Sequence, residues 1–112
     1  MADKSWKAFE RRVARLFGTQ RIPAAGVMGT AQLEAPDFET TLLVAQVKKG
    51  YNPATYLRTW LDGIVRQGER VGRWGVVIWG GKHVKDDDAF VVMRLRDFVT
   101  LHNNAEHGGD DH

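Results

Sequence analysis

The sequence predicts an α/β domain in which a mixed β-sheet is flanked by helices. Three segments, residues 5–17, 53–70 and 96–102, read as helices, and the first two carry apolar residues at helical spacing. Between them lie short runs rich in valine, leucine and isoleucine, bounded by glycine, proline and aspartate, which is typical of strands. The expected order of elements is α-β-β-β-α-β-β-α.

The chain is long enough for one domain. It has 112 residues, of which 43% are hydrophobic and 10% aromatic, so it can build a core. No stretch approaches ~18 uninterrupted apolar residues, which excludes a transmembrane helix. The chain has no cysteine, which excludes disulfides and thiolate metal sites. The N-terminus "MADKSWKAFERR" is charged and lacks the apolar core of a signal peptide, so a cytoplasmic protein is expected.

The first helix is predicted over residues 5–17, with Gly18 as its C-terminal stop. At 100° per residue, Glu10 falls at the margin of the apolar stripe, and Arg11, Arg12 and Arg15 fan out on the other side. The stripe consists of Trp6, Phe9, Val13, Leu16 and Phe17. Glu10 is therefore expected at a core boundary beside a basic surface.

A hairpin is predicted after a short strand and a loop. The strand runs through "TQRIPAAG" and ends at Pro23, and residues 27–34 are expected to be mostly loop. The first arm lies near 34–38, the turn at 39–41, and the second arm is "LLVAQVKK". Side chains alternate along a strand, so Gln46 and Lys48 should project from the same face.

The second helix begins at Asn52-Pro53 and runs to about Arg70, with Gln67 at the edge of its buried stripe. Two strands follow, over 73–81 and 89–95, separated by a loop whose Asp86-Asp87-Asp88 is interpreted as a solvated segment. The globular domain is expected over residues 1–103, and residues 104–112 form a polar tail that should fray.

Charge is distributed unevenly along the chain. Up to Arg73 there are 12 basic and 7 acidic residues, a net charge of +5, whereas the remainder carries 4 basic and 7 acidic residues, a net charge of −3. A basic N-terminal part suggests a polyanionic partner such as nucleic acid.

One group of polar residues suggests chemistry. The two arms of the hairpin bring Asp37 close to Gln46, Lys48 lies two residues further along the same face, and Glu10 can reach in from the first helix. Carboxylate and amide oxygens suit Mg²⁺. A lysine beside them could orient a water or offset charge on a phosphoryl group, which is what phosphodiester hydrolysis requires. The alternative is that Asp37 is an ordinary turn residue after Pro36, with the strand residues on a solvated face.

Five segments, taken in order, resemble the PD-(D/E)xK nuclease superfamily, and most closely the archaeal Holliday junction resolvases and their phage and prophage relatives. The resemblance covers roughly residues 5–102. The segments are "SWKAFERRVARLFG", "RIPAAG", "APD", "VAQVKKG" and "DDDAFVVMRLRDF". It implies a small restriction-endonuclease-like fold.

The resemblance also implies roles for particular residues. Asp37 corresponds to the metal-binding aspartate, Gln46 and Lys48 to the acid-x-lysine motif, Glu10 to the helix glutamate, and Gln67 to a crossing-helix glutamine. On this basis Asp37, Gln46, the Val47 carbonyl and Glu10 would hold Mg²⁺, with Mn²⁺ as a substitute. The residues expected to contact DNA phosphates are Arg11, Arg12, Arg15, Arg21 and Lys49.

The function that the resemblance implies is a metal-dependent endonuclease for branched or junction DNA, acting as a homodimer in recombination and repair, in the cytoplasm of a bacterial host. The chain departs from the pattern where Ala24-Ala25 replaces a loop serine and where Gln46 replaces a carboxylate. Two alternatives stay open. One is a DNA-binding accessory protein with the same fold and little cleavage, and the other is a structural phage interaction module.

Overall fold

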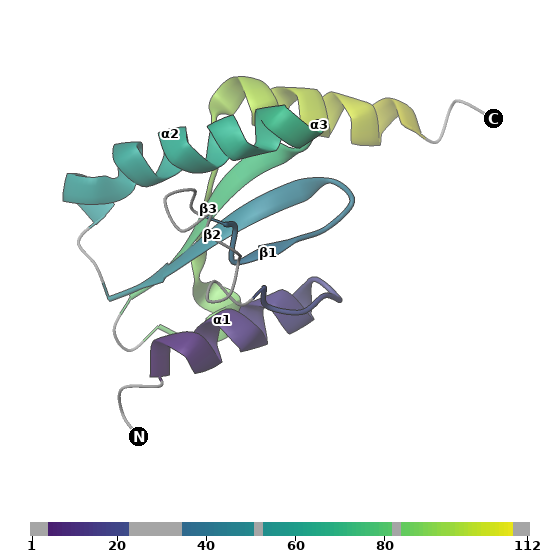
Figure 1. Cartoon of the computed structure of the whole chain (residues 1–112). Helices are drawn as coiled ribbons and strands as arrows, with labels where there is room; N and C mark the ends of the chain where they lie inside the picture. Colours follow the sequence, from purple (N-terminus) through teal and green to yellow (C-terminus); the bar gives the residue numbers. More distant parts are fainter. Residues whose placement is uncertain (1–4, 23–34, 51–52, 82–83, 109–112) are drawn as a thin grey trace.

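A computed structural model describes residues 5–22, 35–50, 53–81 and 84–108 (Figure 1). Its four strands form one mixed sheet in the order β1-β2-β3-β4. β1 (Phe38–Glu39) pairs antiparallel with β2 (Leu43–Lys49), β2 pairs parallel with β3 (Trp74–Gly80), and β3 pairs antiparallel with β4 (Phe90–Val92). The predicted α/β class with a mixed sheet is confirmed.

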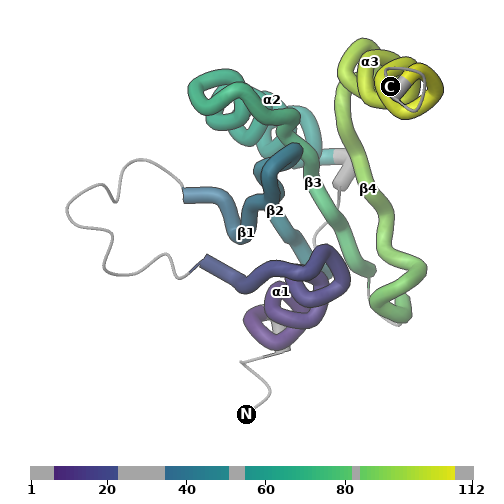
Figure 2. Tube along the Cα trace, turned by 90° about the vertical axis from the view of Figure 1, so that its right-hand side faces the viewer, coloured from purple at the N-terminus to yellow at the C-terminus, as the bar shows by residue number. Residues whose placement is uncertain are grey.

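The helices lie on both sides of this sheet (Figures 1 and 2). They are α1 (Ser5–Leu16), α2 (Pro53–Val71) and α3 (Leu95–Gly108), and a 3₁₀ turn, η2 (Asp86–Asp88), precedes β4. α2 makes the crossover that parallel strands require. Among the described helices, none is both long and apolar enough to cross a membrane.

Alternation along β2 divides the core into two layers. Ala45 and Val47 pack with Phe9 and Val13 of α1 on one face. Val44 packs with Ile64 of α2 on the other. The face that carries Val44 therefore also carries Gln46 and Lys48, as predicted.

Glycines let α2 approach the sheet closely. A Cβ on Gly68 would collide with the Arg73 carbonyl, and one on Gly75 would collide with the backbone of Ile64. Because α2 is fixed at this depth, its side chains have a defined position over β2.

The structure corrects several boundaries in the described residues. The last strand, predicted over 89–95, spans only Phe90–Val92, because the chain turns into α3 at Leu95. Residues 19–22 are not a strand, although the Ile22 N–H donates to the Asp37 carbonyl at 2.7 Å. The hairpin turn lies one residue later than predicted, because the Thr40 hydroxyl accepts from the N–H groups of Leu42 and Leu43 at 3.1 and 3.0 Å. The expectations for Pro23–Gly26, residues 27–34 and Asn52 lie outside the described residues.

A further correction concerns the C-terminus. The predicted helix over 96–102 continues to Gly108, so most of the segment expected to fray is helical. No proline or glycine interrupts residues 103–107, and His102 lies 3.7 Å from Glu106 one turn on, where the two side chains can support the helix.

Candidate functional site

The candidate site forms where the β1–β2 hairpin stops pairing. The Asp37 N–H donates to the Ala45 carbonyl at 2.8 Å, which is the last backbone bond of the hairpin between described residues at this end. Two residues further along β2, the Val47 N–H donates to Asp37 Oδ2 at 2.7 Å. The carboxylate thus takes the place of a strand partner and is fixed against the backbone of β2.

A pocket of about 410 Å³ opens at this point. Glu10 reaches it from α1, Asp37 from the strand that leads into β1, and Gln46 and Lys48 from β2. The predicted convergence of these four residues is therefore what the structure shows. Its lining also includes Phe9, Val47, Lys49 and Gly50.

Glu10 does not lie free in the pocket. Its side chain is buried, and its Oε1 accepts a hydrogen bond from Arg21 Nε at 2.5 Å. Arg21 is also largely buried, with 18% of its side chain exposed. A charge buried to this degree requires a partner, so each of the two side chains holds the other in place.

Asp37 is the electrostatically perturbed group of the site. Burial raises the pKa of Asp37 to about 6; the Val47 N–H bond opposes this rise, and the charge of Glu10 adds to it. Lys48 and Arg21 act in the lowering direction. A carboxyl group with its pKa near neutrality in a pocket is a candidate functional group.

Lys48 is positioned by the crossing helix. Its Nζ lies 5.2 Å from the centre of the Trp60 ring, within the range of a cation–π interaction. Trp60 in turn stacks with Tyr56 one turn earlier on α2, at 5.6 Å between ring centres. Trp60 could not be predicted as a neighbour of Lys48 from the sequence, because only the depth and direction of α2 bring the two side chains together.

The basic residues expected to bind DNA fall into two groups. Arg11 and Arg15 are exposed and line a second hollow together with Arg21. Arg12, in contrast, forms an ion pair with Asp86 of η2, with Nε 2.6 Å from Oδ2. The interpretation of the three aspartates as a solvated segment is wrong for Asp86, because its ion pair links the turn before β4 to α1.

The structure does not bring Gln67 to the pocket. Gln67 does not line it, and its neighbour Gly68 packs against Arg73 and Gly75 at the start of β3. Gln46 and Lys48 are paired with Val77 and Trp79, towards the other end of that strand. The role at the site that the resemblance implies for Gln67 is therefore not supported by its position.

The oxygen donors of the pocket suit a hard divalent cation. Asp37 offers a carboxylate and Gln46 an amide oxygen. The N–H and carbonyl of one strand residue point to the same side. The Val47 carbonyl is therefore directed to the edge where its N–H meets Asp37. Among the described residues, no group of three or more acidic, histidine or cysteine side chains is placed to hold a metal. Gln46 would thus have to provide the metal ligand that a second unpaired carboxylate would otherwise provide.

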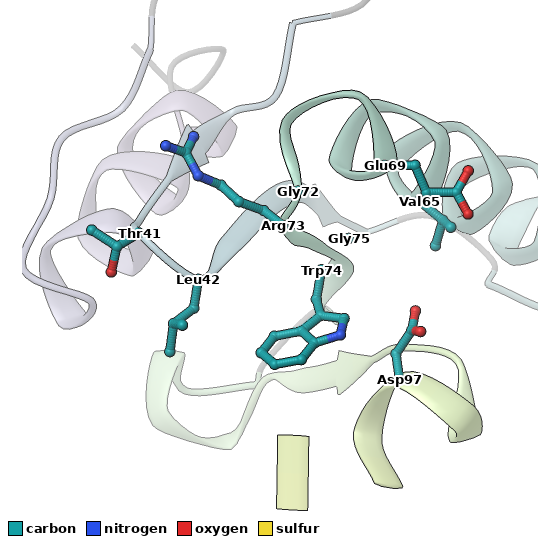
Figure 3. Close-up of a pocket in the computed structure, with 9 residues that line it drawn as sticks. All are labelled: Thr41, Leu42, Val65, Glu69, Gly72, Arg73, Trp74, Gly75 and Asp97. Carbon is teal, nitrogen blue, oxygen red and sulfur yellow. The ribbon is translucent and has the colours of Figure 1, made fainter. Parts of the chain in front are cut away.

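A pocket of similar size, about 380 Å³, lies at the opposite end of the β2–β3 pair (Figure 3). It is lined by Glu69, Trp74 and Asp97 among others, and the Arg73 guanidinium points away from it and pairs with Glu39. None of the lysines that the structure describes lines this pocket.

The comparisons with known proteins add no assignment. Neither the family models, nor the curated proteins, nor the solved structures include a match to this chain.

Proposed function

We propose that the protein is a divalent-metal-dependent endodeoxyribonuclease that hydrolyses phosphodiesters in branched DNA, in the manner of a Holliday junction resolvase. The observation that carries the proposal is the meeting of Asp37, Gln46, Lys48 and Glu10 in one pocket at the end of the hairpin. The resemblance to PD-(D/E)xK nucleases assigns chemistry to these same positions.

In this proposal Asp37, Gln46 and the Val47 carbonyl hold Mg²⁺ or Mn²⁺. A metal ion held there would supply Lewis-acid activation of the phosphate and of water. Lys48 places its ammonium group beside the phosphate, where negative charge develops as water attacks phosphorus and an ester P–O bond breaks. The cation–π contact with Trp60 limits the freedom of Lys48, so the charge is in place before the reaction.

Arg11 and Arg15 hold DNA phosphates in this proposal, together with Lys49 at the rim of the pocket. Arg12 and Arg21 contribute less, since each already pairs with a carboxylate. Two copies of the pocket in a homodimer would act on the two strands of a junction. Such an enzyme fits a phage or prophage protein that acts in recombination and repair in the bacterial cytoplasm.

A second candidate is a DNA-binding accessory protein with little or no cleavage. It is favoured by the pairing of Glu10 with Arg21, which leaves Asp37 as the one carboxylate of this pocket without an ion pair to a described residue. A neutral amide at Gln46 adds no charge to compensate. Under this candidate the pocket would bind a metal too weakly to support hydrolysis.

The deciding experiment incubates the protein with labelled linear, flapped and four-way-junction DNA, each with Mg²⁺, with Mn²⁺ and with chelator. Metal-dependent nicking that favours the junction supports the endonuclease. Junction binding that weakens steeply with salt but leads to no nicking favours the accessory protein. The absence of salt-dependent binding would contradict both candidates and favour a structural interaction module.

A further inference from the structure

An apolar surface at the edge of the sheet has only local contacts in the described structure, since Phe90 stacks with Trp79 and Phe98 lies beside His102 one turn on. β4 is the last strand of the sheet, and 53% of Phe90 and 59% of Val91 are exposed. α3, which follows β4, exposes Leu95, Phe98 and Val99. We refer to these five residues as the β4–α3 surface. Phe90 and Val91 are consecutive in β4, so their side chains lie on opposite faces of the sheet beside its open edge. Monomers rarely expose several large apolar side chains in one region, and an open apolar edge strand is a template for pairing with another chain.

α3 itself has little to hold it to the fold. Between Leu95 and His107, Asp97 and Leu101 are half-buried and the other residues are exposed. Figure 2 shows α3 beside the end of β4, at the margin of the molecule. A helix of this length is marginal in water without tertiary packing. Its apolar residues would gain most of their stabilisation from another molecule.

The charges on either side of β4 indicate which kind of molecule fits this surface. Asp86, Asp87 and Asp88 precede the strand, and Arg94 and Arg96 follow it. The sequence "DDDAFVVMRLR" therefore has an acidic end and a basic end around an apolar centre. If a second copy pairs antiparallel, each acidic end meets a basic end; if it pairs parallel, like charges meet.

We propose that the β4–α3 surface binds a second copy of this chain, with the two β4 strands antiparallel about a two-fold axis at Val91. An isologous contact of this kind uses the same patch on both protomers. With Val91 opposite its own copy, Phe90 lies opposite the second copy's Val92, and the acidic turn η2 of each copy lies towards Arg94 and Arg96 of the other. The two sheets join across this edge, and the exposed apolar side chains of the two copies cover one another.

Three of the charged residues are well suited to a test. Asp86 and Arg94 also pair within the protomer, with Arg12 and Asp62 respectively. Asp87, Asp88 and Arg96 are exposed, and none forms an ion pair with a described residue. Changing them alters the proposed interface while leaving the known contacts of the protomer intact.

The experiment measures the oligomeric state of the full chain by sedimentation over a wide range of protein concentration, without DNA or metal. The variants are Asp87→Lys/Asp88→Lys, Arg96→Glu, and Arg66→Glu as a control on the exposed side of α2. We expect the wild type and the control to be dimers. The first two variants should each dimerise about tenfold or more weakly, because like charges then face one another.

An equal mixture of the two weakened variants should restore the dimer. In a mixed pair, the lysines of one copy face the new glutamate of the other, and the original aspartates face the original arginine. A monomeric wild type overturns the proposal, as would an unchanged dimer in both variants. A mixture that stays monomeric would overturn the antiparallel arrangement.

This inference deepens the homodimer included in the proposed function by locating its interface. Its evidence is the exposed edge and the charge pattern, and its readout is the molecular mass in solution. A failure here would therefore leave the endonuclease proposal to be judged by cleavage, and a failure of cleavage would leave the dimer intact.

Discussion

The two pockets at opposite ends of the β2–β3 pair have similar volumes, about 410 and 380 Å³, and each has two carboxylates in its lining. They differ in what surrounds those carboxylates. At the candidate site, Asp37 is bonded to the Val47 backbone and has a raised pKa, and Lys48 and Lys49 are close by. In the far pocket Glu69 is exposed, and the described part of the chain contributes no lysine to the lining. The two pockets therefore cannot be distinguished by volume or by the number of carboxylates. They are distinguished by the desolvation of Asp37 and by the ammonium group of Lys48 next to it.

This difference predicts that cleavage depends on one pocket only. Asp37→Asn and Lys48→Ala should each reduce nicking by ~10²–10³, since each removes a positioned electrostatic group. Junction affinity measured without metal should change little, because it is spread over many basic side chains. Asp97→Asn in the far pocket and Lys85→Ala, an exposed lysine, are the matched controls. Full activity of both site variants would place the chemistry elsewhere.

The raised pKa of Asp37 predicts an effect on stability that runs against its effect on activity. Burial raises the pKa of Asp37 to about 6 in the fold, compared with an ordinary value of 3.8 for an aspartate in the unfolded chain. As the pH rises from about 4 to 6, the unfolded chain ionises first, and the free energy of unfolding falls. Above pH 6 the destabilisation is complete.

Asp37→Asn should therefore raise the free energy of unfolding by about 1–2 kcal/mol at pH 8, after discounting the full shift for residual solvent access. The gain should fade as the pH is lowered to about 4. Urea denaturation without metal at both pH values is the measurement, with Asp97→Asn as the control. An equal effect at both pH values would show that the change acts through packing and not through ionisation.

DNA affinity should be affected by the arginines that remain exposed. Arg11→Ala/Arg15→Ala should weaken binding about tenfold and lower the salt slope by up to about two, equally for all sequences. Arg12→Ala should have less effect on the slope, because Arg12 already pairs with Asp86. The control is Arg66→Ala/Arg70→Ala on the exposed face of α2. If both double variants lower the slope equally, the basic face of α1 is not the principal contact.

The smallest expected effect concerns the metal. Gln46→Glu should lower the Mg²⁺ concentration needed for half-maximal nicking several-fold, because it adds a charged oxygen ligand. Gln67→Glu lies outside the pocket and should leave that concentration unchanged. An unchanged requirement in Gln46→Glu would mean that Gln46 is not a ligand. If the wild type is inert with every divalent ion while Gln46→Glu cuts, the accessory-protein candidate is supported.

Most of the site could be predicted because it depends on local geometry. Alternation along a strand places Gln46 and Lys48 on one face wherever the strand lies, and a short hairpin places Asp37 opposite Gln46. The helical period places Glu10 at the core margin of α1. Each of these relations depends on no more than about a dozen residues of sequence. The approach of α1 to β2 does not, and it was expected only from the resemblance.

Contacts between elements could not be predicted in this way. The pairing of Glu10 with Arg21, the contact of Lys48 with Trp60 and the ion pair of Arg12 with Asp86 each join segments whose relative position is set by packing. Gln67 shows the reverse case. Its helix face was predicted, but the direction of α2 carries it away from the pocket.

The sequence by itself determined the class of fold, the faces of its helices and strands, and the set of polar residues that could form a site, because periodicity and turn chemistry act over short distances. The tertiary structure alone decided which carboxylate forms an ion pair, which carboxylate is buried without one, and which apolar surface stays exposed. These properties depend on the distances between elements, since both ion pairing and desolvation change steeply over a few ångströms. No pattern within a single element contains those distances.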